Sequence, residues 1–187
     1  MKQKKIVVIV DEQYDFCRGG ALEVPGATRA LAGTCRFLEQ FKDDISRVVL
    51  TADWHPITHC SFVKQGGPWP PHCVQHSHGA AIHERVLQVL HRLELPYEIV
   101  TKGKHRDQEE YGAFSQPRKL FEGRDVWIMG LAGDFCVMET ALNLRKSNPA
   151  RLTLYAPGIG SINAKNFNRL VEEHTAPRSK FRLFKNS

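Results

Sequence analysis

Five apolar runs rich in β-branched residues recur along this chain, and segments with helical spacing separate them. The runs lie at residues 5–10, 47–52, 97–102, 125–132 and 151–156. Runs that are apolar almost throughout are typical of strands in a parallel sheet that is covered on both faces. The alternation therefore predicts βαβ units and a doubly wound α/β fold, with a mainly parallel sheet flanked by helices on both faces.

The segments between the runs place apolar side chains on one helical face. They lie at residues 28–41, 80–93, 135–146 and 163–174. In the first of them, Leu31, Cys35 and Leu38 recur at helical spacing. A short run at 180–184 can add a final strand. A chain of 187 residues has the size of one domain, so we expect a single domain over residues 1–187.

One stretch, at about residues 54–79, follows neither the helical nor the strand period. It is rich in Pro, Gly and His, and it begins just past the end of the second predicted strand. A connection of this length inside a compact domain is usually functional when it is ordered. The aromatic and proline residues of "GGPWPPHCV" argue against disorder. We therefore predict an irregular, functional insert here.

Composition excludes several classes of protein. With 42% hydrophobic and 25% charged residues, the chain can form a globular core. The net charge is +6, but the basic residues form short patches, so we expect no nucleic-acid partner. No apolar run approaches the roughly 20 residues that span a bilayer, so we expect no membrane partner. The five cysteines are irregularly spaced without a CxxC motif, which favours free thiols and a cytoplasmic location.

Four chemically active side chains follow the ends of predicted strands. Asp11 follows the first strand, Asp53 the second, Lys102 ends the third, and Cys136 comes soon after the fourth. In open α/β sheets, ligands bind beyond the carboxyl ends of the strands. Each residue alone has a structural interpretation, as a capping carboxylate, a solvated lysine or a buried thiol. Their common edge makes a reactive site the better hypothesis.

Cys136 is the candidate nucleophile of this edge. It is expected in the first turn of a helix, where free backbone N–H groups and the helix dipole would lower its pKa and could hold an oxyanion. Asp11 could take the thiol proton, and Lys102 could keep Asp11 ionised or stabilise the thiolate.

The stretch "TADWHPITHCSF" concentrates an acid and two imidazoles within seven residues, Asp53, His55 and His59. A polar surface turn, an acid–base pair and half of a metal site all remain open from these residues alone.

Several blocks together resemble one family. They are "IVDEQYDFCRGGAL", "TADWHP" with "HCSF", "WPPHC", "TKG" followed by "YGAF", and "GLAGDFCVMETAL", in family order over residues 6–144. The chain resembles the nicotinamidases, also called pyrazinamidases, of the isochorismatase-like cysteine hydrolase superfamily. It departs from the family pattern at Glu12 and Tyr14, where an apolar residue and Asn are common.

The resemblance implies a catalytic triad of Asp11, Lys102 and Cys136. It also implies an oxyanion hole formed by the backbone N–H groups of Ala132 and Cys136, with a cis peptide bond between Leu131 and Ala132.

The resemblance further implies a substrate pocket. Phe16 and Trp69 would hold the substrate ring between them, with Tyr111 nearby and Gln13 in the pocket wall.

A metal site is implied by the same resemblance. Its ligands would be Asp53, His55 and His72, holding one divalent ion, with Zn²⁺ favoured over Fe²⁺ or Mn²⁺. His59 is an uncertain fourth ligand, because some relatives use a His there while others leave the position to water or to a Ser, here Ser61.

The implied reaction is the hydrolysis of nicotinamide, and also of pyrazinamide, through a thioester on Cys136. The resemblance thus implies an enzyme of NAD salvage that acts on a small molecule. Such an enzyme can be a homo-oligomer. One alternative is another cysteine amidase of the superfamily, such as an N-carbamoyl hydrolase, whose members generally lack the metal ligands. The other is a non-catalytic metal-binding or thiol-sensing module.

Overall fold

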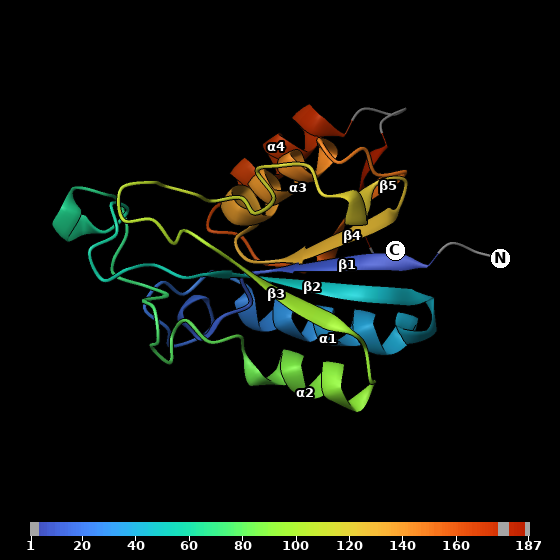
Figure 1. Ribbon diagram of the computed structural model, residues 1–187, viewed down its shortest axis with the longest axis horizontal. Coiled ribbons are helices and arrows are strands. Elements are labelled where there is room, and N and C mark those ends of the chain that lie inside the picture. The colour runs from blue at the N-terminus through green and yellow to red at the C-terminus, as the bar shows by residue number, and fades with distance from the viewer. Residues whose placement is uncertain (1–3, 176–179, 186–187) are drawn as a thin grey trace.

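The computed structural model describes residues 4–175 and 180–185, which are built around a six-stranded parallel sheet (Figure 1). The strands run in the spatial order β3-β2-β1-β4-β5-β6, and every neighbouring pair is parallel. Their bounds are β1 Lys5–Val10, β2 Ile45–Asp53, β3 Tyr97–Lys102, β4 Asp125–Gly130, β5 Arg151–Ile159 and β6 Phe181–Phe184. All five predicted strands and the additional sixth strand are confirmed.

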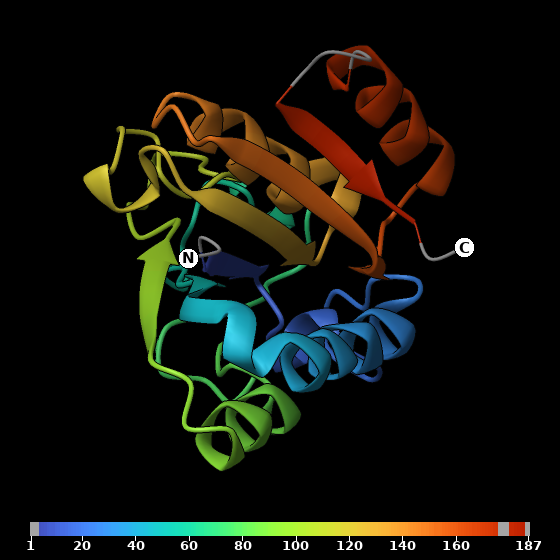
Figure 2. The ribbon, with the colours of Figure 1, turned by 90° about the vertical axis from the view of Figure 1, so that its right-hand side faces the viewer.

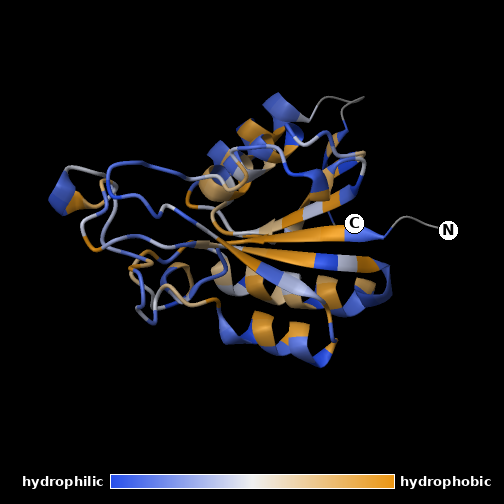
Figure 3. Cartoon of the chain, in the orientation of Figure 1, coloured by the Kyte–Doolittle hydropathy of each residue, from blue (hydrophilic) through white to orange (hydrophobic). Residues whose placement is uncertain are grey.

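Two layers of helices cover the sheet, as Figures 1 and 2 show. On one face lie α1 (Ala27–Phe41) and α2 (Glu84–Arg92), and on the other lie α3 (Met138–Arg145) and α4 (Ala164–His174). All six residues of β1 are buried, as expected for a central strand covered on both sides. Figure 3 shows the apolar residues concentrated in the central strands and on the inner faces of the helices. The doubly wound α/β fold is confirmed.

The second helix is shorter than predicted. It begins at Glu84 rather than at residue 80, and the His83 side chain caps it by accepting a hydrogen bond from the Arg85 N–H at 3.2 Å. The preceding residues pair with the loop after β1 instead, because Ile82 bridges Gln13 and the Tyr14 N–H donates to the Ala81 carbonyl at 3.1 Å. This pairing is a tertiary contact that helical spacing cannot reveal.

The fourth strand and the third helix also differ from their predicted bounds. β4 ends at Gly130, whose φ of +125° suits glycine, and a Cβ there would lie 2.0 Å from the Val10 carbonyl oxygen. A π-helical turn over Gly133–Val137 then precedes α3. Cys136 lies in this turn and not in the first α-helical turn. Such turns occur frequently at functional sites.

The predicted insert is ordered but largely irregular. Between β2 and α2 the helical structure is limited to a short 3₁₀ turn at Val63–Gln65, and isolated bridges join His55 to Val74 and Phe62 to Trp69. Phe62 is fully buried. The insert therefore folds back on itself around aromatic side chains, beyond the carboxyl end of β2 (Figure 1).

The strand order places this region at a topological switch point. β1 lies between β2 and β4, and the order reverses there, so the loops after β1 and β4 diverge to opposite faces. Within the described part of the chain, no helix is both long and apolar enough to cross a bilayer.

Candidate active site

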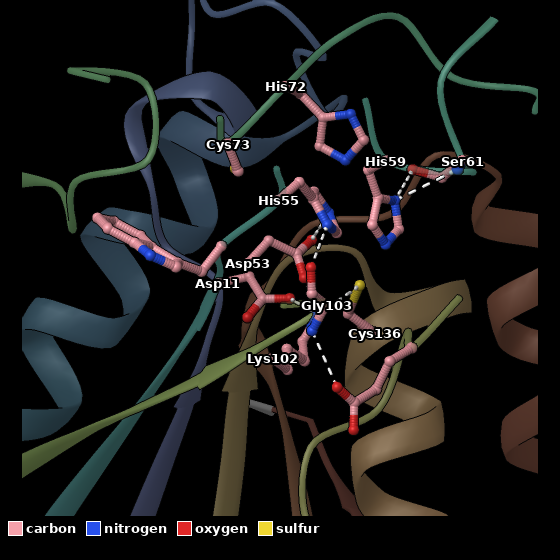
Figure 4. Close-up of polar contacts among 12 residues, drawn as sticks. Asp11, Asp53, His55, His59, Ser61, His72, Cys73, Lys102, Gly103 and Cys136 are labelled. Carbon is pink, nitrogen blue, oxygen red and sulfur yellow. Dashed lines mark hydrogen bonds and ion pairs between the residues drawn. The ribbon is translucent and has the colours of Figure 1, made fainter. Parts of the chain in front are cut away.

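The thiol, carboxylate and ammonium groups predicted from the strand ends meet in the structure (Figure 4). The Lys102 Nζ atom lies 2.8 Å from Asp11 Oδ2 and 3.6 Å from Cys136 Sγ. The Thr51 hydroxyl donates to Asp11 Oδ1 at 2.6 Å. Asp11 is completely buried, and its φ of +50° turns the chain sharply at the end of β1. These contacts place a base and a cation next to one thiol.

The neighbouring carboxylates keep Lys102 in its ammonium form. Burial opposes its charge, but the carboxylates of Asp11 and Asp53 outweigh burial and raise the Lys102 pKa well above its usual value. Burial raises the pKa of Asp11, although Lys102 counteracts it. Asp11 is therefore a stronger base than an exposed carboxylate.

The Cys136 thiol differs from the sequence-based expectation of a lowered pKa. Burial raises its pKa well above the usual value, and the charges of Asp11 and Asp53 add to this effect, while Lys102 opposes it. The expectation considered the helix end and Lys102, but it omitted burial, which has the largest effect, and the two neighbouring carboxylates. The thiol thus keeps its proton until a base removes it.

Backbone N–H groups lie beside the thiol. The Leu131–Ala132 peptide bond is cis, as expected. Among residues 4–175 and 180–185, the Ala132 N–H finds no hydrogen-bond acceptor. The Ala132 N–H is therefore free to donate to a ligand.

Asp53, His55 and His72 form a compact group of potential metal ligands. Their ligating atoms all lie within 4.8 Å of one another, and all three residues are buried. The His55 Nδ1–H donates to the Gly103 carbonyl at 2.9 Å, and the His72 Nδ1–H donates to the Pro70 carbonyl at 2.8 Å. These hydrogen bonds leave Nε2 of each imidazole to face the group, and the His55 Nε2 atom lies 3.5 Å from Asp53 Oδ2.

Neighbouring charges set the protonation of this group. Burial would lower the His55 pKa, but the hydrogen bond and the charge of Asp53 outweigh burial and raise it. Burial would raise the Asp53 pKa, but Lys102 and His55 together lower it, so Asp53 remains a carboxylate. Burial lowers the pKa of His72, which keeps that imidazole neutral. One carboxylate and two imidazoles match the ligand preferences of zinc and similar ions.

His59 is adjacent to this group but is occupied by other contacts. Its ring centroid lies 4.1 Å from that of His55. Its Nε2–H donates to the Gln108 carbonyl at 3.1 Å, and its Nδ1 accepts from the Ser61 hydroxyl at 2.7 Å. Both ring nitrogens of His59 therefore have hydrogen-bond partners within the protein.

A cavity opens beside the thiol and the candidate metal ligands. Of the predicted substrate-binding residues, Phe16, Trp69 and Tyr111 line it. The Trp69 Nε1–H donates to the Tyr111 hydroxyl at 3.0 Å, which joins the insert to the loop after β3. Asp53, His55, His72 and Cys136 also line the cavity.

Gln13 has a different position from the pocket wall that was expected. Its side chain donates to the carbonyls of Asp53 and Ala80 at 2.8 and 2.7 Å, and it accepts from the Asp53 N–H at 2.8 Å. Gln13 is not among the cavity-lining residues. Gln13 therefore holds the backbone of Asp53 by two hydrogen bonds and so positions a candidate metal ligand.

Sequence reasoning missed further residues of the cavity. They are the apolar residues Leu22, Val24, Phe135 and Ile162 and the acidic residues Glu109 and Glu110. Only Phe135 carried a usable signal, because it is next to Cys136. Ile162 is held in place by Asp134, whose carboxylate accepts from the Ile162 and Asn163 N–H groups at 2.9 Å each.

Comparisons with known proteins agree with this geometry. A family model for the isochorismatase domain matches residues 5–150. The chain is 32% identical to a nicotinamidase of Escherichia coli over 165 residues, covering 74% of this chain and 75% of that protein. It is 33% identical to a nicotinamidase of Acinetobacter baylyi over 175 residues, covering 75% of this chain and 74% of that protein.

Solved structures show the same likeness. A pyrazinamidase of Pyrococcus horikoshii in complex with zinc is 29% identical, with a TM-score of 0.78 and coverage of 98% of this chain and 99% of that chain. PnC1 of L. infantum, in complex with nicotinate, is 33% identical, with a TM-score of 0.79 and coverage of 91% and 88%.

Proposed function

Because this chain belongs to the isochorismatase domain family and is a hydrolase acting on an amide, we propose that it converts nicotinamide to nicotinate and ammonia. Pyrazinamide, which presents a similar ring and the same amide, is the second proposed substrate. The observation that carries the proposal is the position of the Cys136 thiol, which lies beside Lys102 and Asp11 and lines the same cavity as Asp53, His55 and His72.

The proposed reaction begins with proton transfer. Asp11 takes the thiol proton, and the Cys136 sulfur attacks the amide carbon. The N–H groups of Ala132 and Cys136 stabilise the oxyanion, an effect worth roughly 3–4 kcal/mol per donor in other enzymes. Protonated Asp11 then gives its proton to the departing ammonia. Water hydrolyses the thioester, releasing nicotinate and restoring the thiol.

Lys102 supports these steps through its charge. Because its pKa is raised well above its usual value, it stays cationic at working pH. It lies close to both Asp11 and Cys136, so it stabilises the thiolate as that anion forms. Phe16 and Trp69 are proposed to hold the substrate ring between them.

A divalent metal ion held by Asp53, His55 and His72 would anchor the pyridine nitrogen of the substrate. We propose that zinc occupies the site, with iron and manganese as alternatives that the same ligands accept. The group of three ligating atoms within 4.8 Å supports this assignment. His59 is left out of the proposed ligand set because both its ring nitrogens have other partners.

The setting of the protein is part of the proposal. We propose a single domain acting in the cytoplasm, where it can form a homo-oligomer. The five cysteines, all in the described residues, are free thiols, as suits a reducing compartment.

Replacing the nucleophile tests the mechanism. We expect Cys136→Ala to lower the rate of ammonia release from nicotinamide by at least about 10³-fold, while zinc binding measured by elemental analysis is retained. Cys60→Ala, which removes a half-buried thiol outside the cavity, is the matched control and should keep its activity. Ammonia release by Cys136→Ala at the rate of the unchanged protein would refute the mechanism.

The same assay separates the alternatives. Release of ammonia from N-carbamoyl amino acids and not from nicotinamide would identify an N-carbamoyl hydrolase. No turnover of either substrate, with zinc bound, would identify a non-catalytic module.

A further inference from the structure

The loop after β3 connects an acidic side chain to a candidate metal ligand through one glycine. The Glu110 carboxylate accepts a hydrogen bond from the Gly103 N–H at 2.9 Å. The Gly103 carbonyl in turn accepts from His55 Nδ1–H at 2.9 Å, a contact drawn in Figure 4. Neither Glu110 nor Gly103 was assigned a role by the catalytic chemistry above.

Gly103 has a conformation and a position that other residues could not adopt without strain. Its φ is +61°, in the left-handed region. A Cβ at this position would lie 2.4 Å from His55 Cε1 and 2.6 Å from His55 Nδ1. The backbone of Gly103 is therefore in direct contact with the His55 ring, and a change in the conformation of Gly103 would move the carbonyl that binds this ring.

Glycine does not hold such a conformation by itself, because it has no side chain to restrict its backbone. The peptide between Lys102 and Gly103 is instead held from both sides. The Lys102 carbonyl accepts from the Trp54 N–H at 2.9 Å, and the Gly103 N–H donates to Glu110. Without Glu110, one of these two restraints is lost, and the Gly103 carbonyl that binds His55 becomes freer to rotate.

We propose that Glu110 is a positioning residue that acts through Gly103 to hold the His55 imidazole, with Nε2 available, in the geometry that binds the metal ion. This inference rests on the proposed metal site. It extends that site because Glu110 is distant from His55 in the sequence and does not belong to the group of ligating residues. Residues that orient a metal-bound imidazole usually affect metal affinity strongly.

The loop has other anchors that do not involve Glu110. The Arg106 carbonyl accepts from the Cys60 N–H at 2.8 Å, and the Gln108 carbonyl accepts from His59. Glu110 itself is half-buried. Its replacement is therefore expected to leave a folded protein.

The test compares zinc affinity in the full chain, measured by competition with a chromophoric chelator. We expect Glu110→Ala to weaken zinc binding about 10-fold, at the lower end of the effect known for residues that orient metal ligands. Glu110→Gln keeps a carbonyl acceptor for the Gly103 N–H and should restore affinity to within about threefold, since it loses only the charge-assisted part of the bond. Glu122→Ala removes an exposed carboxylate outside the cavity and should bind zinc like the unchanged protein.

A second measurement does not depend on metal or activity. Hydrogen exchange of the Gly103 amide, followed by NMR on the metal-free protein, should be faster in Glu110→Ala than in the unchanged protein and restored in Glu110→Gln. If Glu110→Ala fails to fold, Glu110→Asp provides the same comparison, because its shorter side chain does not reach Gly103 while its charge is kept.

The outcomes separate this inference from the proposed function. Equal zinc affinity and equal Gly103 exchange in Glu110→Ala and the unchanged protein would overturn the role of Glu110 alone. If the unchanged protein binds no zinc, the proposed metal site is wrong and the inference falls with it.

Discussion

Glu12 is a buried acid directly after Asp11, the proposed catalytic base, in sequence. It is fully buried, and its Oε1 atom accepts a hydrogen bond from the Thr34 hydroxyl at 2.6 Å. Its Oε2 atom has no hydrogen-bond partner among the described residues. Burial raises the Glu12 pKa to about 8, although the Thr34 hydrogen bond opposes this. The folded protein therefore holds a proton at neutral pH that the unfolded chain releases.

This difference predicts a pH-dependent cost to stability. Between the ordinary glutamate pKa and a pKa of about 8, only the folded state keeps the proton, so the free energy of unfolding falls as the pH rises through this range. Glu12→Gln removes this titration. We expect it to raise the free energy of unfolding by about 1–3 kcal/mol at pH 8 relative to the unchanged protein. The gain should shrink toward pH 4.5.

Urea unfolding of both proteins at several pH values checks this prediction. Glu23→Gln, which alters an exposed acid, is the control and should leave the pH profile of stability unchanged. Parallel pH profiles for Glu12→Gln and the unchanged protein would show that Glu12 does not carry the effect.

At the scale of elements, the first helix approaches the fifth strand unusually closely. A Cβ added at Gly33 of α1 would lie 2.1 Å from the Pro157 carbonyl oxygen of β5. Because α1 follows the loop that carries Phe16, and β5 leads to the segment that carries Ile162, this packing fixes two walls of the cavity relative to each other.

This close approach reverses the usual effect of replacing glycine in a helix. Alanine in place of glycine normally stabilises an exposed helical position by about 1 kcal/mol. At Gly33 we expect Gly33→Ala to lower the free energy of unfolding by about 1–3 kcal/mol, because the helix must move away from β5. Chemical denaturation measures this, with Arg36→Ala on the exposed side of α1 as the control. A stabilised Gly33→Ala variant would mean that the helix has room to move.

At the scale of the whole molecule, the proposed metal site joins distant parts of the chain. Asp53 ends β2, His72 belongs to the insert, and Gly103, which follows β3, accepts a hydrogen bond from His55. A metal ion bound to these residues would tie the irregular insert to the sheet. Since the ion binds the folded state, it should stabilise the protein in proportion to its concentration over its Kd.

Metal removal tests this link. We expect chelation to lower the Tm and to abolish ammonia release from nicotinamide, and zinc add-back to restore both. At a free zinc concentration about 100 times the Kd, the stabilisation should be about 2.7 kcal/mol.

His72→Ala should lose the zinc-dependent change in Tm, while His91→Ala, which replaces an exposed histidine of α2, should keep it. An equal zinc shift in both variants would contradict the assignment of His72.

The strands and helices could be predicted well because their signals are local. Apolar periodicity relates residues within a few positions of each other, so β1 was predicted with its correct bounds. Apolar periodicity did not predict the ends of helices and strands that depend on tertiary contacts. The start of α2 depends on the pairing of Gln13 with Ile82, and the end of β4 depends on the contact of Gly130 with Val10.

By itself, the sequence determined the parallel sheet, the rim where Asp11, Lys102 and Cys136 meet, and the family pattern around them. Only the tertiary structure decided which nitrogen of His55 donates to the Gly103 carbonyl and that Glu110 reaches Gly103. It also decided that both nitrogens of His59 are occupied and that the Cys136 thiol is held protonated by burial. The reason is physical: periodicity is set by neighbours along the chain, whereas hydrogen-bond partners and pKa values are set by side chains that irregular loops bring together from distant positions.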